Sequence, residues 1–88
     1  MRLQLDPSVV IVDEDGIIYL VPLGETPRRL NRAASLIVRS LKKHNDVAVL
    51  LLEYAGTLNI PRDQAEQEVH CFVQWMEEKG YVSNSASS

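Results

Sequence analysis

The sequence predicts an α+β domain in which a three-stranded antiparallel sheet is followed by three helices. Two short β-branched runs flank an acidic turn near the start of the chain. After residue 30 the apolar positions take helical spacing, and each expected helix begins at a favourable capping or proline position. The 88 residues fit one domain. We assign residues 1–82 to it and residues 83–88, which are small and polar, to a disordered tail.

The first two strands are expected to form a hairpin. Residues 9–12 read VVIV and residues 17–21 read IIYLV, and the intervening DEDG combines acidic turn formers with a glycine that tolerates positive φ. Neither run alternates between apolar and polar residues, as a strand with one solvated face should. One face of the hairpin should therefore cover the core, and the other should dock a partner or a second copy. The residues assigned to this docking surface are Val10, Val12, Ile18 and Leu20.

A short edge strand is expected next, at Arg28–Leu30, after the breaker-rich segment PLGETP. Its two arginines and the nearby proline suit an edge that must not pair indiscriminately.

Two helices are expected between residues 31 and 56. Asn31 is a suitable N-cap for a helix that runs to about residue 43. Asn45-Asp46 then caps a second helix over residues 47–55, which Gly56 ends. The second helix is apolar nearly all round, so we expect it to be the most buried of the three.

The third helix begins with Pro61 at its first position and ends near Gly80. Its apolar stripe should face the core, while one flank carries residues that this stripe does not explain. Trp75 on that flank either lines a groove or closes the edge of the core. The stripe is Ala65, Val69, Phe72, Val73 and Met76, and the flank is Glu68, Cys71 and Trp75.

No catalytic or metal-binding constellation is expected. His70 and Cys71 are adjacent in one helix and diverge by about 100°, so they cannot act together as base and nucleophile. His44 has no partner at metal-ligand spacing. The four glycines are scattered and form no phosphate-binding loop. The sequence therefore predicts a protein that is not an enzyme and needs no metal or cofactor.

The charge and the termini narrow the class of partner. A formal net charge of −3 is unusual for a nucleic-acid binder, although basic residues cluster locally between residues 28 and 43 and would favour an acidic partner. The single cysteine excludes an intrachain disulfide. The start of the chain lacks the apolar stretch of a signal peptide, and no segment is apolar enough to span a membrane. We expect a cytoplasmic protein that binds neither membrane nor nucleic acid.

The order of these elements resembles the PqqD family, which is named for a coenzyme PQQ synthesis protein. The resemblance rests on VVIVDEDGIIYLV, RRLN, RAASLIVRSL, DVAVLLLEYAG and PRDQAEQEVHCFVQWMEEKGYV, over roughly residues 8–82. It implies a winged-helix-like RiPP recognition element, which binds the leader segment of a ribosomally made precursor peptide. Such a domain presents the leader to a modifying enzyme or leader peptidase, as in lasso-peptide clusters.

The resemblance also implies where the leader binds. The leader adds as a strand to the third strand, in a cleft walled by the third helix. Carried over by position, the peptide-binding residues would be Arg28, Arg29, Leu30, Glu68, Val69, Phe72, Val73, Trp75 and Met76.

Two other functions stay open. A winged-helix nucleic-acid-binding protein would need a basic third helix, whereas acidic residues outnumber basic ones there. A structural dimerisation module would be favoured if the outer face of the hairpin self-associates. Leader binding requires no dimer, so that function predicts a monomer or a weak dimer.

Overall fold

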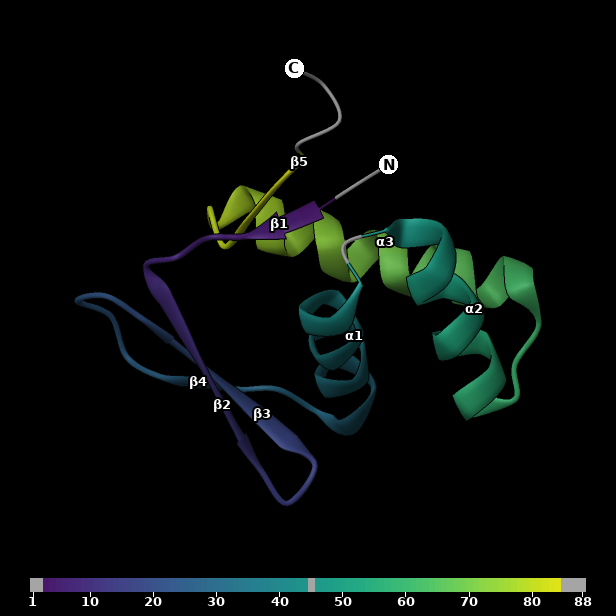
Figure 1. Ribbon diagram of the computed structural model, residues 1–88, viewed down its shortest axis with the longest axis horizontal. Coiled ribbons are helices and arrows are strands. Elements are labelled where there is room, and N and C mark those ends of the chain that lie inside the picture. Colours follow the sequence, from purple (N-terminus) through teal and green to yellow (C-terminus); the bar gives the residue numbers. More distant parts are fainter. Residues whose placement is uncertain (1–2, 45, 85–88) are drawn as a thin grey trace.

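Two small antiparallel sheets and three helices make up the fold, which a computed structural model describes for residues 3–44 and 46–84. Strands β2, β3 and β4 form one sheet, and β1 pairs with β5 in the other, at the top of Figure 1. The predicted α+β class is confirmed. None of the helices in the described residues is long and apolar enough to cross a membrane. The elements are β1 (Leu3–Leu5), β2 (Val9–Glu14), β3 (Ile17–Pro22), β4 (Arg28–Arg29), α1 (Arg32–Lys43), α2 (Val47–Leu58), α3 (Arg62–Glu78) and β5 (Val82–Asn84).

The β2–β3 hairpin turns at Asp15 and Gly16, as the DEDG segment predicts. Both residues have positive φ, 53° and 85°, and two such residues give a turn whose twist matches that of the strands. The turn pairs Glu14 with Ile17, so every even-numbered residue of β2 lies opposite an odd-numbered residue of β3. This register decides which side chains share a face.

The outer face of the hairpin differs from the predicted docking surface. Val10 and Val12 lie on it, 59% and 41% exposed, and Tyr19 is paired with Val12 there. Ile18 and Leu20 lie on the opposite face, and each is 0% exposed in the core. The prediction that they share a docking surface with Val10 and Val12 is therefore wrong. A strand that is apolar at every position does not reveal its register, which only the turn fixes.

A buried serine joins the end of β4 to the sheet. The N–H of Leu30 donates to the carbonyl of Ile18 at 2.9 Å. The N–H of Ile18 donates instead to the Ser35 hydroxyl at 2.9 Å, and that hydroxyl lies 3.5 Å from the Leu30 carbonyl. Because Ser35 belongs to α1, this bridge fixes the start of α1 against β3. The assigned strand ends at Arg29, one residue earlier than predicted.

The helix starts largely follow the predicted caps. The Asn31 side chain accepts a hydrogen bond from the Ala34 N–H at 2.7 Å, and the Asp46 side chain accepts one from the Ala48 N–H at 2.9 Å. Asn45, the other residue predicted to cap α2, lies outside the described residues. Pro61 is the N-cap of α3 rather than its first helical residue.

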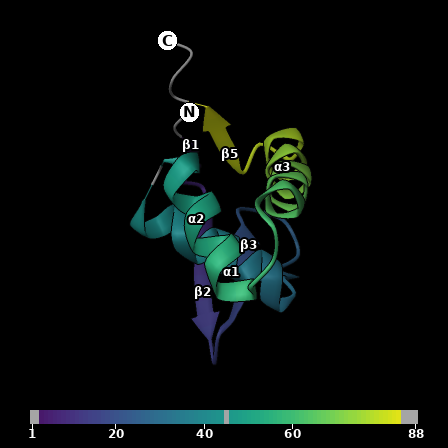
Figure 2. The ribbon, with the colours of Figure 1, turned by 90° about the vertical axis from the view of Figure 1, so that its right-hand side faces the viewer.

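Helix α2 is longer and less buried than predicted. It continues through Gly56 to Leu58, and its C-cap Asn59 takes the left-handed conformation with φ 54°. Only Leu50 and Tyr54 are buried on it, and Leu52 is 67% exposed. Figure 2 looks at the domain from this side and shows α2 in front. A helix at the edge of the domain buries one stripe, whatever the polarity of its other faces.

The second sheet has no counterpart in the prediction. Leu3 of β1 pairs with Asn84, and Leu5 pairs with Val82 of β5. Residues 83 and 84, which the sequence analysis assigns to a disordered tail, are thus the last residues of β5, and residues 85–88 lie outside the described residues. Strands of three residues show no periodicity, and this pair forms because α3 returns the chain beside its start.

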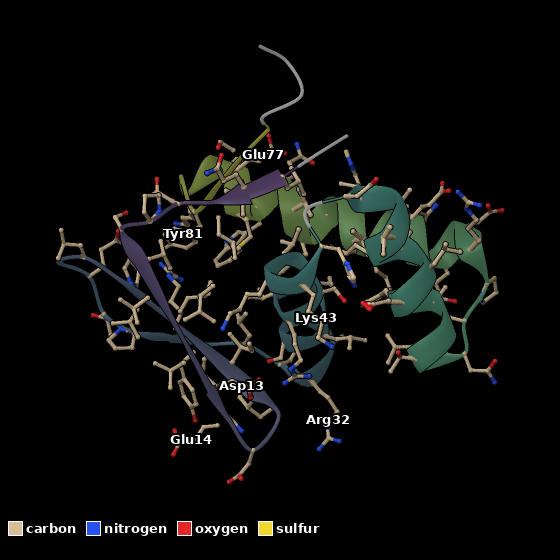
Figure 3. All side chains as sticks on the ribbon, viewed as in Figure 1. Asp13, Glu14, Arg32, Lys43, Glu77 and Tyr81 are labelled. Carbon is tan, nitrogen blue, oxygen red and sulfur yellow. The ribbon has the colours of Figure 1, made fainter. Side chains whose placement is uncertain are left out.

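An ion pair links the hairpin to α1. The Nε atom of Arg39 on α1 lies 3.0 Å from Oδ2 of Asp13, and Figure 3 labels Asp13 on the hairpin. The hydrogen bond from the Arg39 guanidinium holds the pKa of Asp13 below its ordinary value. Both side chains are partly exposed, so the pair orients the hairpin more than it stabilises the fold.

Candidate functional site

A groove separates α3 from β4 and the first turns of α1. It consists of two adjoining hollows of about 340 and 550 Å³. The smaller hollow lies beside β4, and the larger one continues between α1, α2 and α3. Asn31, Ala34 and Phe72 line both hollows, so they form a continuous depression. We call this depression the β4–α3 groove.

Aromatic rings form the α3 wall beside β4. The Trp75 ring lies 5.7 Å from the Phe72 ring and 5.7 Å from the Tyr81 ring, measured between centroids. The guanidinium carbon of Arg28 lies 5.7 Å from the Trp75 centroid, in cation–π contact. Trp75 therefore does both things that the sequence left open: it closes the core against the buried Tyr81 and lines the groove.

Strand β4 offers a backbone edge to this groove. Tyr19 pairs with Arg29, and Leu20 pairs with Arg28. In an antiparallel ladder the pairs alternate, and Leu30 bonds to Ile18, so the backbone N–H and C=O of Arg29 point away from β3. Sheet order makes β4 an edge strand. An extended peptide can therefore pair with Arg29 while its side chains enter the groove.

A tyrosine–carboxylate pair stands at the far end of the groove. The Tyr54 hydroxyl donates to Glu68 Oε1 at 2.5 Å, and Gln64 Nε2 donates to Glu68 Oε2 at 2.8 Å. The hydrogen bond from Tyr54, and to a smaller extent that from Gln64, holds the pKa of Glu68 below its ordinary value, so the carboxylate stays ionised. Burial, reinforced by Glu68, raises the pKa of Tyr54 to about 12, which keeps its hydroxyl a donor.

The predicted peptide-binding residues fall into two groups. Arg28, Arg29, Leu30, Phe72 and Trp75 line the hollow beside β4, and Glu68 lines its neighbour. The remaining three do not line this groove. Each directly follows Glu68, Phe72 or Trp75 on α3, so its side chain points about 100° away around the helix axis. They belong to the core, with exposed fractions of 2%, 7% and 0%: Val69, Val73 and Met76.

Several lining residues were not among the predicted site residues. Ala33 and Ala34 leave room beside α1, and small residues at a helix start were the signal that could have indicated it. Tyr54 gave no signal, because its place depends on how α2 packs against α3. Cys71, which the sequence places on the same flank as Glu68, is exposed and lines the groove.

A larger hollow, of about 620 Å³, lies on the opposite flank of α3. Val47 and Leu51 of α2 line it together with Val69 and Val73. Its lining residues among those the structure describes belong to α2 and α3, so none of them offers a peptide the backbone edge of a strand. Within the described residues no cluster of histidine, cysteine or acidic side chains is placed to hold a metal ion.

The arrangement defines a class of fold: a hairpin, a short edge strand and three helices, with a groove between the edge strand and the last helix. Two solved structures share it. A structure of TbiB1 in complex with the TbiA(beta) leader peptide is 17% identical, with a TM-score of 0.85, and the match covers 92% of this chain and 95% of that one. A lasso peptide synthetase B1 complexed with its leader peptide is 21% identical, with a TM-score of 0.81, covering 96% and 100%.

These likenesses confirm the fold that the resemblance to the PqqD family implied. No family model matches the sequence. No curated protein matches it at a significant level.

Proposed function

We propose that this protein binds the leader segment of a ribosomally made precursor peptide in the β4–α3 groove and presents it to a modifying enzyme or leader peptidase. The observation that carries this proposal is an outward-facing strand edge at Arg29 beside an aromatic wall. The similar chains were solved with leader peptides. The protein acts as a binding module rather than a catalyst. It works in the cytoplasm, where such precursors are synthesised.

The direct test uses Trp75, the single tryptophan of the chain. Leader segments of any short precursor peptide that its neighbouring genes encode, and the leader peptides of the two similar structures, are titrated into the protein while Trp75 emission is followed. Because Trp75 lines the groove, binding should change its emission saturably. A scrambled peptide should leave the emission unchanged. If no such leader alters the emission or releases heat in calorimetry, leader binding is excluded.

Strand addition itself predicts a specific effect of proline at Arg29. The variant Arg29→Pro removes the outward N–H but no bond to β3, and proline is tolerated in edge strands. Losing one backbone hydrogen bond and leaving its partner unsatisfied should weaken leader binding about tenfold. Isothermal titration calorimetry measures the change.

The matched control is Arg29→Ala, which removes the guanidinium and keeps the N–H. It should retain most of the affinity. Equal losses in the two variants would show that the side chain, not the strand edge, holds the leader.

The outer hairpin face, which we define as Val10, Val12, Ile17, Tyr19 and Val21, is the proposed docking surface for the enzyme that acts on the leader. Tyr19 is paired with Arg29, so this face continues directly from the edge on which the leader would lie. Val10 and Val12 are its most exposed members. All groove residues come from one chain, so leader binding needs no second copy.

Lysines introduced on the outer hairpin face should weaken enzyme docking without affecting leader binding. The double variant Val10→Lys with Val12→Lys should weaken binding of the proposed partner enzyme by about tenfold or more, through the lost apolar contact. Leader affinity should not change. Leu52→Lys, at a position on α2 that is 67% exposed, is the control for a lysine placed on another exposed apolar residue. Unimpaired enzyme binding by the double variant would exclude this surface.

The nucleic-acid-binding alternative finds no support in the positions of the charges. Helix α3 exposes Asp63, Glu66, Glu77 and Glu78. Arg62, a basic residue of that helix, is already paired with Glu66 at 3.2 Å.

A further inference from the structure

The β4–α3 groove carries opposite charges at its two ends. Beside β4, the Arg28 guanidinium lies over the Trp75 ring, and within residues 3–44 and 46–84 it takes part in none of the ion pairs. At the other end, Glu68 lines the groove. Arg28 is exposed and Glu68 is half-buried, so a bound peptide can reach both charges.

Glu68 is fixed in place before any ligand arrives. Its two oxygens accept one hydrogen bond each, from Tyr54 and from Gln64. A carboxylate has about four acceptor sites, so each oxygen keeps capacity for a further donor. Both present donors are neutral and leave the negative charge uncompensated. A charge held in this way loses little side-chain entropy when it pairs with a ligand.

The separation of the two charges sets a spacing in the peptide. Glu68 and Trp75 are seven residues apart on α3, which is about 10 Å along the helix axis. An extended peptide advances about 3.3 Å per residue, and its side chains alternate between faces. Two side chains that both enter the groove are therefore an even number of residues apart. Four residues span about 13 Å, enough to reach both charges, whereas two span only about 7 Å.

The direction of the peptide follows from the sheet. Each pairing among β2, β3 and β4 is antiparallel, and an added strand that continues this pattern runs opposite to β4. Arg28 lies at the start of β4, while Asn31, just after it, lines the hollow that contains Glu68. An antiparallel peptide therefore passes Glu68 first and Arg28 later.

We infer that the groove selects an extended segment in which a basic residue is followed four positions later by an acidic residue, the first pairing with Glu68 and the second with Arg28. This inference rests on the proposed leader binding and names the class of leader that the groove accepts.

A displayed library of random peptides tests the inference without knowledge of the natural leader. Peptides are selected on the immobilised full chain, and on the variants Glu68→Gln and Arg28→Gln. The glutamine at position 68 keeps an acceptor for the Tyr54 hydroxyl. Its new NH2 group replaces the oxygen that accepts from Gln64, and the Gln64 amide can turn over to offer its own oxygen to this NH2 group, so the main loss is the charge. The wild-type chain should enrich the basic-to-acidic pattern. Glu68→Gln should lose the basic preference alone, and Arg28→Gln the acidic preference alone.

Matched controls make the same charge changes outside the groove. Glu66→Gln alters an acid of α3 that lines the separate hollow of about 620 Å³, outside the β4–α3 groove. Arg32→Gln alters an exposed residue at the start of α1, and Figure 3 shows the Arg32 side chain projecting from the molecule. Both controls should enrich the same peptides as the wild-type chain.

Affinities of one selected peptide complete the test. Replacing its basic residue with alanine should weaken binding to the wild-type chain about fivefold, and binding to Glu68→Gln less than about twofold. Enrichment of apolar peptides without the charge pattern, or a pattern that both groove variants retain, overturns the inference and leaves leader binding standing. No enrichment by any chain overturns both.

Discussion

The variant Leu20→Lys is expected to unfold the domain. Leu20 is 0% exposed on the core face of β3, and its neighbours across the sheet are Ile11 and Arg28, neither of which can neutralise an ammonium group. Burying an unpaired charge costs about 5 kcal/mol or more. A domain of 88 residues has a total stability of roughly 4–13 kcal/mol. Far-ultraviolet circular dichroism and thermal melting should show no cooperative transition.

Val12→Lys is the matched control on the neighbouring strand. Val12 lies on the outer hairpin face and is 41% exposed, so the lysine should stay in water and the melting temperature should change little. The contrast tests the register directly. If Leu20→Lys folds as well as Val12→Lys does, the two faces of the hairpin have been exchanged.

Removing the indole at Trp75 should have the largest effect on leader binding. Trp75 supports Arg28 by cation–π contact and forms the wall beside β4. Tryptophans at the centre of an interface commonly contribute 2 kcal/mol or more, so Trp75→Ala should weaken binding about 30-fold. Calorimetry is the suitable measurement, because the variant has lost its fluorescent residue.

Folding and binding must be separated in this experiment, since Trp75 also packs against Tyr81. Trp75→Phe keeps an aromatic ring against Tyr81 and should lose less affinity while melting close to the wild-type chain. Should Trp75→Ala remain folded and bind the leader normally, the aromatic wall would have no part in recognition.

Local signals in the sequence predicted the features that depend on a few neighbouring residues. The Asp15-Gly16 turn and the caps at Asn31 and Asp46 formed as predicted, because each is decided by the conformational preference or hydrogen bonding of the residue itself. The flank of α3 that carries Glu68 and Trp75 was predicted from helix geometry, and these residues do line the groove.

Features that depend on distant segments were not predicted. The faces of the hairpin require the register, which apolar runs conceal, so Ile18 and Leu20 were placed on the wrong side. The burial of α2 depends on its position at the edge of the domain, and the pairing of β1 with β5 depends on where α3 ends. Tyr54 reaches Glu68 only through the packing of α2 against α3.

The pairing of β1 with β5 places Leu3 opposite Asn84, on the side of the molecule away from the tip of the hairpin (Figure 1). The first and last strands, β1 and β5, therefore lie next to each other and at a distance from the backbone edge at Arg29. A unit with adjacent ends can be spliced into a surface loop of a larger protein through two short linkers without straining its interior. The fold is thus equally suited to serve as a domain inserted into a multidomain enzyme and as a separate protein.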